Sequence, residues 1–454
     1  MSSLAVVVLA AGMGTRMKSG LPKVLHKIAG RTMLGHVLHA AKELGAAKAV
    51  VVHGPDMQAV EKEASAVLAH CAFAEQRERL GTGHAVSMAG AALKDFKGQV
   101  LVLYGDAPLI KAETLRELLA KLDAKHKMAV LGFAADNPQG YGRLIVKGKA
   151  VQGIVEQLDA SPSQRKIKLC NSGIIAIDNE LLWQLLPKLS NKNAKGEYYL
   201  TDLVKLATKA KTKVALALCS EGEVAGVNDR NQLSVLERQF QLEARRAAME
   251  GGATLIDPDT VYFSADTKLG RDVVIEPNVF FGPKVTVGDE VEILANSHIE
   301  GAVIAKGARI GPFVRLRPGA EIGENAHVGN FVEIKKAVIG KGAKANHLTY
   351  IGDAIVGAGS NIGAGTITCN YDGYEKHLTD IGENVFVGSN TALVAPVKIG
   401  NGVNIAAGSV VTKDVPSDAL AISRPELQIK SGWAARYRAV KQAAKAAKKN
   451  KEQH

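Results

Sequence analysis

A six-residue repeat of aliphatic side chains runs through the second half of this 454-residue chain and constrains its fold more than any other feature. The repeating positions are Leu269, Ile275, Phe281, Val287, Ile293 and Ile299, then, after a change of phase, Ile310, Leu316, Ile322, Val328 and Ile334, and later Ile381, Val387, Leu393, Ile399, Ile405 and Val411. A helix repeats about every 3.6 residues and a strand about every two, so neither gives this step. The repeat predicts a parallel β-helix whose triangular coils place one aliphatic side chain inward on each side.

Residues 370–377, NYDGYEKH, interrupt the repeat. An interruption in a solenoid maps to a loop at one edge, which is often the binding edge. A tolerated surface insertion is the alternative, because loops accept extra residues readily.

The first half of the chain has a different pattern, in which apolar strands alternate with helical stretches. The strand-like segments are 4–9, 49–53 and 100–103, and the segments with helical spacing are 32–44 and 112–122. This alternation predicts a doubly wound, Rossmann-like α/β domain that binds ligands at the carboxyl ends of its strands.

Residues 229–250 contain no glycine or proline and are rich in strong helix formers, and Gly251 and Gly252 follow them. The segment therefore predicts a helical arm that joins two domains. The expected divisions are 1–228 for the α/β domain, 229–250 for the arm, 251–435 for the β-helix and 436–454 for a basic tail.

The formal net charge of +12 is concentrated at one end of the chain. Residues 436–454 hold seven Lys or Arg against one Glu, which is half of the excess. The rest of the chain carries no nucleic-acid-binding motif, so we expect attraction for small phosphorylated ligands and no binding of nucleic acid. A solvated, frayed end is the simplest interpretation of the tail.

The cysteines and the hydropathy pattern bear on the compartment. Cys71, Cys170, Cys219 and Cys369 are scattered, without the spacing of a structural zinc site, which favours reduced thiols in a cytoplasm. The apolar start is too short for a signal peptide, and we expect no membrane insertion because no apolar run reaches about 18 residues.

The stretch LAAGMGTRMKSGLPK, from Leu9 to Lys23, follows the first predicted strand. Gly12 and Gly14 allow the main chain to approach a ligand and to point N–H groups at phosphate oxygens. Arg16 can offer a planar fork to a phosphate and Lys23 a point charge. A glycine turn alone is often only a tight connection, but two placed cations favour a nucleoside polyphosphate site. The stretch resembles the signature of the sugar-phosphate nucleotidyltransferases, the pyrophosphorylases.

This resemblance implies a set of ligands in the first half of the chain. The implied UTP and UDP-sugar residues are Leu9, Ala10, Ala11, Gly12, Gly14, Lys23, Gln76, Gly81, Thr82, Tyr104, Gly105, Asp106, Gly140, Glu156, Asn171 and Asn228. Asp106 and Asn228 match the positions that hold Mg²⁺, while Arg16 and Lys23 would stabilise the transition state. The segment 76–80 is more charged than the Gln-rich version usual in the family, which leaves the roles of Arg77 and Arg79 open.

In the second half, His347 is the only histidine with a supporting group of residues around it in the sequence. A neutral imidazole could accept a proton from an amine, because its ordinary pKa lies near neutral pH. Together with the first half, this pattern resembles the family of bifunctional bacterial N-acetylglucosamine-1-phosphate uridyltransferases and glucosamine-1-phosphate acetyltransferases. The resemblance extends from Leu4 to about Trp433. Likeness to hexapeptide acyltransferases suggests left-handed coils and a homotrimer.

The resemblance also implies roles for residues of the β-helix. His347 would be the catalytic base, and Glu333 would help to orient it. Arg317, Lys335, Tyr350 and Asn361 would bind the amino-sugar phosphate. The implied acetyl-CoA residues are Ala364, Asn370, Tyr371, Ser389, Ala407 and Arg424.

The resemblance thus implies an enzyme that acetylates glucosamine-1-phosphate with acetyl-CoA and then transfers UMP from UTP to N-acetylglucosamine-1-phosphate. Two alternatives remain at this point. In one, the β-helix is a regulatory or assembly module of a nucleotidyltransferase with a single activity. In the other, the basic tail makes the chain a nucleic-acid binder.

Overall fold

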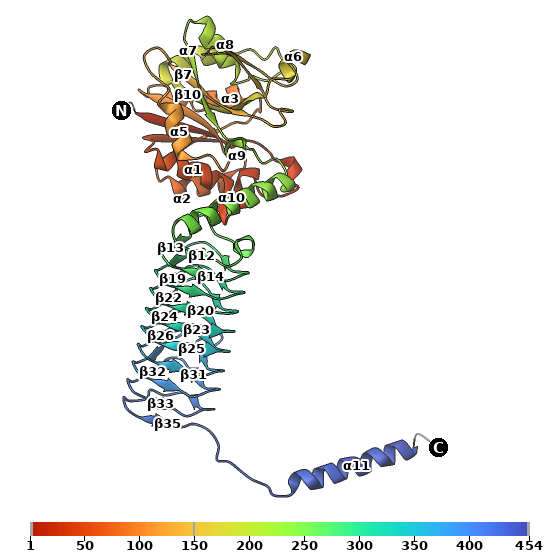
Figure 1. Cartoon of the computed structure of the whole chain (residues 1–454), viewed down its shortest axis with the longest axis vertical. Coiled ribbons are helices and arrows are strands. Elements are labelled where there is room, and N and C mark those ends of the chain that lie inside the picture. Colours follow the sequence, from red (N-terminus) through yellow and green to blue (C-terminus); the bar gives the residue numbers. More distant parts are fainter. Residues whose placement is uncertain (1–2, 149, 452–454) are drawn as a thin grey trace. The chain divides into compact units, whose positions relative to one another are not determined.

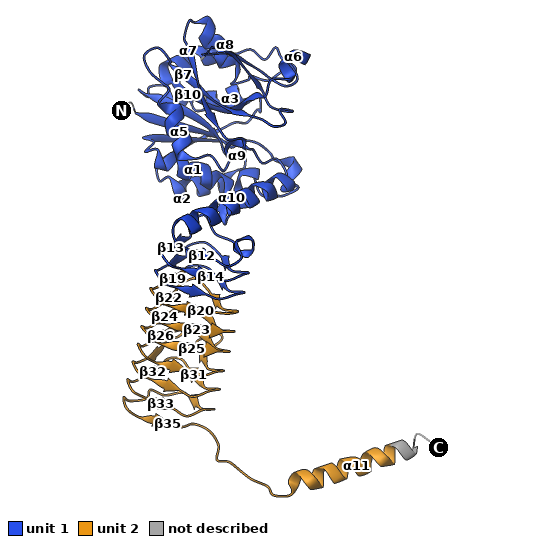
Figure 2. Ribbon diagram, in the orientation of Figure 1, with its two compact units in different colours: residues 1–301 blue, residues 302–454 orange. Residues whose placement is uncertain are grey.

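The structure is a computed structural model that describes residues 3–148 and 150–451. The chain divides into two compact units, of which the first ends at Gly301 and the second begins at Ala302 (Figure 2). The divisions expected at 228, 250 and 435 stay predictions.

The first unit, whose sheet includes the strands labelled β7 and β10 in Figure 1, is built on nine strands with the order β5-β4-β1-β6-β10-β7-β11-β9-β8. Its strands are β1 Leu4–Leu9, β4 Lys48–His53, β5 Cys71–Glu75, β6 Gln99–Tyr104, β7 Met128–Ala134, β8 Arg143–Lys147, β9 Ala150–Val155, β10 Leu169–Asp178 and β11 Val214–Cys219. The first four strands in this order, β5, β4, β1 and β6, run parallel, as predicted. β10 runs antiparallel between β6 and β7, so the sheet is mixed.

Helices cover both faces of this sheet. The helices are α1 Met33–Glu43, α2 Gln58–Val67, α3 Thr82–Met88, α4 Gly90–Leu93, α5 Ala112–Leu119, α6 Pro162–Arg165, α7 Asn179–Leu185, α8 Asp202–Lys209 and α9 Glu221–Val224. Three short 3₁₀ turns and one hairpin complete this unit's α/β part. The turns are η1 Thr15–Met17, η2 Lys23–Leu25 and η3 Leu186–Lys188, and the hairpin pairs β2 Lys27–Ile28 with β3 Arg31–Thr32. α1 and α5 confirm the two helices expected from the spacing, and the Thr32 hydroxyl caps α1 by accepting from the Gly35 N–H.

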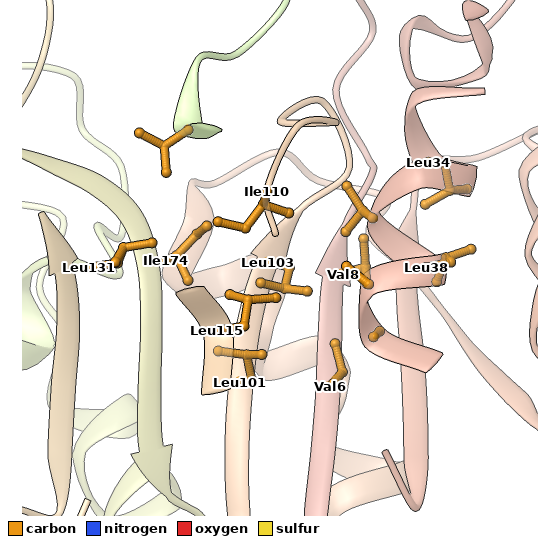
Figure 3. Packing of buried hydrophobic residues seen from close by; sticks show 14 of the residues in the cluster. Val6, Val8, Leu34, Leu38, Leu101, Leu103, Ile110, Leu115, Leu131 and Ile174 are labelled. Atoms are coloured by element: carbon orange, nitrogen blue, oxygen red, sulfur yellow. The ribbon is translucent and has the colours of Figure 1, made fainter. Parts of the chain in front are cut away.

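The core lies on both sides of the sheet because side chains alternate along each strand. Val6 and Val8 pack under α1, α2 and α5, where Figure 3 shows them with Leu34 and Leu38. Ala5 and Val7 face α3, α7 and α8 on the opposite side. Both faces of the central strands are therefore buried, which explains their near-continuous apolar sequence.

Helix α10, Arg230–Glu250, confirms the predicted helical segment to within one residue, and Asp229 caps it by accepting from the Gln232 N–H. Its polar side chains bond to the main chain of neighbouring segments of the first unit. Glu237 accepts from the Ala29 N–H at 2.7 Å, and Gln241 both donates to and accepts from the Phe263 main chain. These bonds hold the helix against the hairpin and the first β-helix coils.

Those first coils confirm the hexapeptide interpretation. Their elements are β12 Thr254–Leu255, η4 Pro258–Thr260, β13 Lys268–Leu269, β14 Val274–Ile275, β15 Phe280–Phe281, β16 Thr286–Val287, β17 Glu292–Ile293 and β18 His298–Ile299. Lys268 pairs in parallel with Thr286, and Phe280 with His298, so residues eighteen apart are stacked. Three six-residue sides therefore make one coil.

The second unit is a stack of parallel strands followed by one helix. Its elements are β19 Ala302–Ile304, β20 Arg309–Ile310, β21 Arg315–Leu316, β22 Ala320–Ile322, β23 His327–Asn330, β24 Glu333–Ile339, β25 Lys344–His347, β26 Tyr350–Val356, β27 Asn361–Ile362, β28 Ile367–Cys369, β29 Thr379–Ile381, β30 Phe386–Val387, β31 Ala392–Val394, β32 Val397–Ile399, β33 Asn404–Ile405, β34 Val410–Val411, β35 Leu420–Ala421 and α11 Trp433–Lys451. The repeated aliphatic residues of this unit are buried.

The predicted insertion at 370–377 is a loop that lengthens one coil of the second unit. Ala354 pairs with Thr379, twenty-five residues further on and seven more than in a regular coil. The repeat resumes directly afterwards, with Ile381 and Val387 buried. Among the residues that the structure describes, no helix combines the length and the apolar character that a bilayer crossing requires.

Candidate active sites

The first candidate site lies at the carboxyl edge of the central strands in the first unit. β1 and β6 run parallel with Leu9 opposite Tyr104, so the loop after β1 meets the residues that follow β6. Together they border a cleft of about 250 Å³. Its lining residues are Leu9, Ala10, Ala11, Gly12, Lys23, Val24, Gln76, Arg79, Gly81, Thr82, Ala85, Tyr104, Asp106 and Glu197.

Lys23 is the central cation of this cleft. Its Nζ bonds to the Asp106 carboxylate and lies 3.4 Å from Oδ1 of Asn228. Gly14 makes this placement possible, because its φ of 64° is left-handed and a Cβ at this position would overlap the Lys23 side chain. The Val227 N–H donates to the Asp106 carbonyl, which holds Asn228 next to the carboxylate.

Asp106 and Asn228 present two hard oxygen donors to one position. Both converge on the Lys23 ammonium, so the pocket favours a cation at this point. Mg²⁺ takes one or two protein oxygens and completes its shell with water and substrate phosphates. No cluster of three His, Cys, Asp or Glu residues suited to a metal occurs in the described part of the chain. The donor set thus fits a magnesium ion shared with a phosphate ligand.

The segment after β5 forms one wall of the cleft. Buried Gln76 donates from Nε2 to the Gly81 carbonyl at 3.2 Å and lies 3.1 Å from Nδ1 of His84. The Tyr104 hydroxyl bonds to Thr82, and burial raises the pKa of Tyr104 well above its usual range. Tyr104 is therefore a neutral hydroxyl at physiological pH.

Three predicted sugar residues lie close together beside this cleft. Glu156 accepts from the Thr201 hydroxyl at 3.0 Å and also borders a second cleft of about 650 Å³. The Asn171 N–H donates to the Gly142 carbonyl, near Gly140. Asn171 Oδ1 is buried without a protein partner among the described residues, so it can accept from a ligand hydroxyl.

The remaining predicted residues of this unit are placed differently. Gly105 donates its N–H to the Leu9 carbonyl at 3.0 Å and so supports the loop rather than lining the cleft. Arg16 is exposed on η1 and is not among the lining residues in the described part of the chain.

The second candidate site lies in the second unit, where His347 and Asn330 are stacked neighbours on β25 and β23. Nδ1 of His347 lies 2.9 Å from Oδ1 of Asn330. An amide oxygen can only accept, so this bond assigns the proton to Nδ1 and leaves the Nε2 lone pair available. This arrangement prepares a general base.

Two of the residues predicted to bind the sugar phosphate are the cations Arg317 and Lys335. Arg317 donates to Glu333 at 2.7 Å, and Glu333 is the register neighbour of Tyr350. Glu333, expected to orient His347, thus bonds to Arg317, while Asn330 bonds to the imidazole. A side-chain hydrogen bond to Lys376, and then the charge of that residue, lower the pKa of Lys335. Two adjacent ammonium groups are suited to a doubly charged phosphate.

The inserted loop is held by its own hydrogen bonds. Asp372 accepts from the N–H groups of Tyr374 and Glu375 and bonds to Nε2 of His377 at 2.8 Å. These donors hold the pKa of the Asp372 carboxyl far below its usual range. The side chain of Asn370 donates to Asp353 at 2.5 Å, which fixes the start of the loop.

The other predicted acetyl-CoA residues are stacked at one corner of successive coils. The Ala364 carbonyl accepts from the Asn390 N–H, and the Ser389 carbonyl accepts from the Gly408 N–H. Arg424 donates to the Ala407 carbonyl at 2.7 Å. Asn361 stands on β27 next to Lys344 of the preceding coil. These hydrogen bonds thus place Ala364, Ser389 and Ala407 on successive coils, with the Arg424 guanidinium bonded to the last of them.

Comparisons with known proteins agree with this two-part architecture. Residues 6–169 match the model of a MobA-like NTP transferase domain. Residues 301–336 and 379–413 match the bacterial transferase hexapeptide, six repeats. The chain is 56% identical over 451 residues to the bifunctional protein GlmU of Paramagnetospirillum magneticum, covering 99% of each chain. It is 53% identical to that of Azorhizobium caulinodans, over 97% of this chain and 98% of that protein.

The chain belongs to the GlmU family of bifunctional proteins. This membership confirms the resemblance drawn from the motifs, with its uridyltransferase and acetyltransferase activities in UDP-N-acetylglucosamine synthesis. Membership in this family also favours an enzyme with two activities over the alternative in which the β-helix is only a regulatory or assembly module. A solved UDP-glucose pyrophosphorylase complexed with UDP-glucose overlaps 54% of this chain at a TM-score of 0.43 and 16% identity, which is too distant to add to the assignment.

Two functional candidates of this GlmU family member, Asn330 and Lys376, received no role from the sequence. Asn330 stands seventeen residues before His347, one fewer than the eighteen of a regular coil, so the regular repeat does not pair the two residues. Lys376 lies in the insertion, where the repeat stops, and no spacing relates it to Lys335.

Proposed function

We propose that the β-helix site acetylates glucosamine-1-phosphate and that the site in the first unit then transfers UMP from UTP to the acetylated sugar. The convergence of Lys23, Asp106 and Asn228 at one end of the cleft carries the assignment of the second reaction. The imidazole of His347, with Nε2 free of the Asn330 bond, carries the assignment of the first.

In uridyl transfer, an oxygen of the sugar phosphate attacks the α-phosphorus of UTP. The bond between that phosphorus and the bridging oxygen breaks, and pyrophosphate leaves with the electron pair. The nucleophile is already an anion, so the protein contributes position and positive charge rather than a base. Lys23 and the exposed Arg16 would bind the triphosphate, and Gln76, Gly81 and Thr82 the nucleoside.

Asp106 and Asn228 would hold Mg²⁺, because their oxygens meet at a position that already favours a cation. When bound, the ion neutralises charge on the phosphates of the two substrates. Gly140, Glu156 and Asn171 would bind the sugar, and the unpartnered Asn171 Oδ1 supports this role.

In acetyl transfer, Nε2 of His347 takes a proton from the ammonium of glucosamine-1-phosphate. The freed amine attacks the thioester carbon, the C–S bond breaks, and CoA leaves as a thiolate that is then protonated. Arg317, Lys335 and Lys376 would hold the phosphate, with Tyr350 and Asn361 at the sugar. The corner lined by Ala364, Ser389 and Ala407, with Asn370, Tyr371 and Arg424, would bind acetyl-CoA.

The wider assembly is part of the same proposal. Left-handed coils, a homotrimer and a cytoplasmic location follow from the family resemblance and from substrates such as UTP and acetyl-CoA. The divisions 1–228, 229–250, 251–435 and 436–454 would separate the two catalytic parts, the helical arm and the basic tail.

Two assays on the purified chain test the proposal separately. Thiol release from acetyl-CoA with glucosamine-1-phosphate, UTP omitted, reports the first reaction. Pyrophosphate release from UTP with N-acetylglucosamine-1-phosphate, acetyl-CoA omitted, reports the second. We expect both activities, and chelation of Mg²⁺ should abolish pyrophosphate release while sparing thiol release. Absence of thiol release from the folded protein would reduce the β-helix to a structural part, and pyrophosphate release that survives chelation would contradict the magnesium assignment.

Glu156 gives a prediction about both stability and affinity. Burial raises its pKa, and the neighbouring charges of Asp159 and Asp202 act in the same direction. A raised carboxyl pKa in the folded state costs stability once the pH exceeds the unfolded value of about 4.3. Glu156→Gln should therefore raise the Tm of the first unit at pH 7 to 8, and the gain should disappear as the pH falls toward 4.

The same variant should raise the KM for N-acetylglucosamine-1-phosphate by about tenfold, because a charge-assisted hydrogen bond to the sugar is lost. Thermal unfolding at a series of pH values, together with pyrophosphate-release kinetics, measures both effects. Asp159→Asn at the rim of the same cleft is the matched control for removal of a charge alone. A KM unchanged by Glu156→Gln would remove Glu156 from the sugar site.

A further inference from the structure

The two arginines of the segment 76–80 have different environments. The Arg77 side chain is 84% exposed and pairs with Glu75 on the surface. Arg79 donates from Nε to the carbonyl oxygen of Ala11 at 2.9 Å, although 68 residues separate them in the chain. Only Arg79 reaches the loop that follows β1.

Arg79 also lines the cleft that contains Lys23, Asp106 and Gln76. Its bond to Ala11 uses one of the five N–H groups of the guanidinium. The Ala11 carbonyl belongs to the loop Leu9–Gly12, whose main chain borders the cleft. A donor that fixes this carbonyl also fixes the direction of the Gly12 N–H, because both groups belong to one planar peptide unit.

Gly54, directly after β4, makes room for this arginine. A Cβ at Gly54 would lie 2.8 Å from Nη2 of Arg79 and 3.5 Å from the Ala11 oxygen. Gly54 is not among the positive-φ glycines, so its backbone does not require glycine. Glycine at this position therefore leaves the space in which the Arg79 guanidinium packs against the loop Leu9–Gly12.

We propose that Arg79 is a positioning residue of the uridyltransferase site, which holds the loop Leu9–Gly12 in the conformation that binds the nucleoside triphosphate. The inference rests on the proposed UTP site in this cleft. Its consequence is specific, because loss of the Arg79–Ala11 bond weakens binding of UTP and leaves the sugar phosphate and the chemical step unaffected.

Two substitutions of similar length isolate the hydrogen bond. Arg79→Gln places an amide nitrogen at the same chain position as the arginine Nε, so a donor to Ala11 is kept while the charge is lost. Arg79→Met keeps the length and loses the donor. We expect Arg79→Met to raise the KM for UTP about tenfold with kcat within about twofold, and Arg79→Gln to stay within about threefold of wild type.

Arg77→Met is the matched control, because it removes the same side chain from the surface end of the same segment. We expect its kinetics to equal those of wild type. If Arg79→Met also behaves as wild type, or if Arg79→Gln is as impaired as Arg79→Met, the positioning role through Ala11 is wrong. A fall in kcat alone, or a rise in the KM for the sugar phosphate, also contradicts it.

Gly54→Ala provides an independent test through a double-mutant cycle. Its methyl group should displace the guanidinium and raise the KM for UTP in the wild-type background. In the Arg79→Met background we expect no further rise, because the displaced group is already absent. An equal rise in both backgrounds would show that Gly54 acts on the loop without Arg79.

Pyrophosphate release by the wild type is measured first, because it tests the proposed function of the cleft separately from the role of Arg79. If the wild type forms no pyrophosphate from UTP and N-acetylglucosamine-1-phosphate, the proposed function of the cleft fails. If it does, and thermal unfolding shows that the variants are folded, the Arg79 series alone decides the inference.

Discussion

Replacing His347 by alanine is expected to slow thiol release from acetyl-CoA by about 10²- to 10⁴-fold, the usual contribution of a positioned general base. The attacking amine is protonated near neutral pH, and the variant lacks the imidazole that would take its proton. Uridyl transfer should be unchanged, because every residue assigned to it lies in the first unit. The two activities in one chain thus give each variant an internal control.

Asn330 provides a finer test of the same base. Its Oδ1 accepts from Nδ1 of His347 at 2.9 Å and so selects the tautomer with a free Nε2. Asn330→Ala should lower kcat for acetyl transfer less than His347→Ala does and should shift the limb of the pH–rate profile that reports the base. His327→Ala, on the same strand as Asn330, is the control. If the pH–rate profile of acetyl transfer by His347→Ala still shows the limb that reports the base, the base is another group.

The β-helix was predictable from the sequence because its period is set by inward packing. Each coil buries one aliphatic side chain per side, so Ile310, Leu316 and Ile322 carry the register in the sequence itself. The same regularity predicts which residues are stacked in the regular coils, but not the pairing of Asn330 with His347, which are seventeen residues apart. The mixed direction of β10 was not predictable, because strand polarity depends on pairing between distant segments.

The contacts of the sites were only partly predictable. The glycine turn after β1 was recognised because its residues are consecutive in the sequence and Gly14 adopts a left-handed φ, and the cations were recognised because they follow this turn closely. By contrast, Arg79 meets Ala11 across 68 residues, and Lys376 meets Lys335 across an insertion without a repeat. Neither pair has a spacing that a helix, a strand or the hexapeptide repeat would predict. Such residues are found only when the folded chain brings their loops together.

Replacing Lys23 by methionine is expected to lower the kcat/KM of uridyl transfer by about 10²- to 10³-fold, as loss of a preorganised charge at a transition state does. Methionine keeps most of the side-chain length and removes the ammonium that bonds to Asp106 and lies 3.4 Å from Asn228. Lys27→Met, four residues further on and exposed, applies the same change outside the cleft and should leave both activities intact. Pyrophosphate release measures the effect, and thiol release should not change.

A double variant tests whether Lys23 and Asp106 act together in uridyl transfer. If the two groups act as one unit on the same phosphates, their losses are not additive. The double variant of Lys23→Met with Asp106→Asn should therefore be about as slow as the slower single variant, and Asp106→Asn should also need more Mg²⁺ for half-maximal rate. Fully multiplicative losses would mean that the lysine and the carboxylate serve separate steps. The ion pair would then maintain only the cleft without ligands, with Asp106 and Asn228 holding Mg²⁺ and Lys23 binding the triphosphate independently.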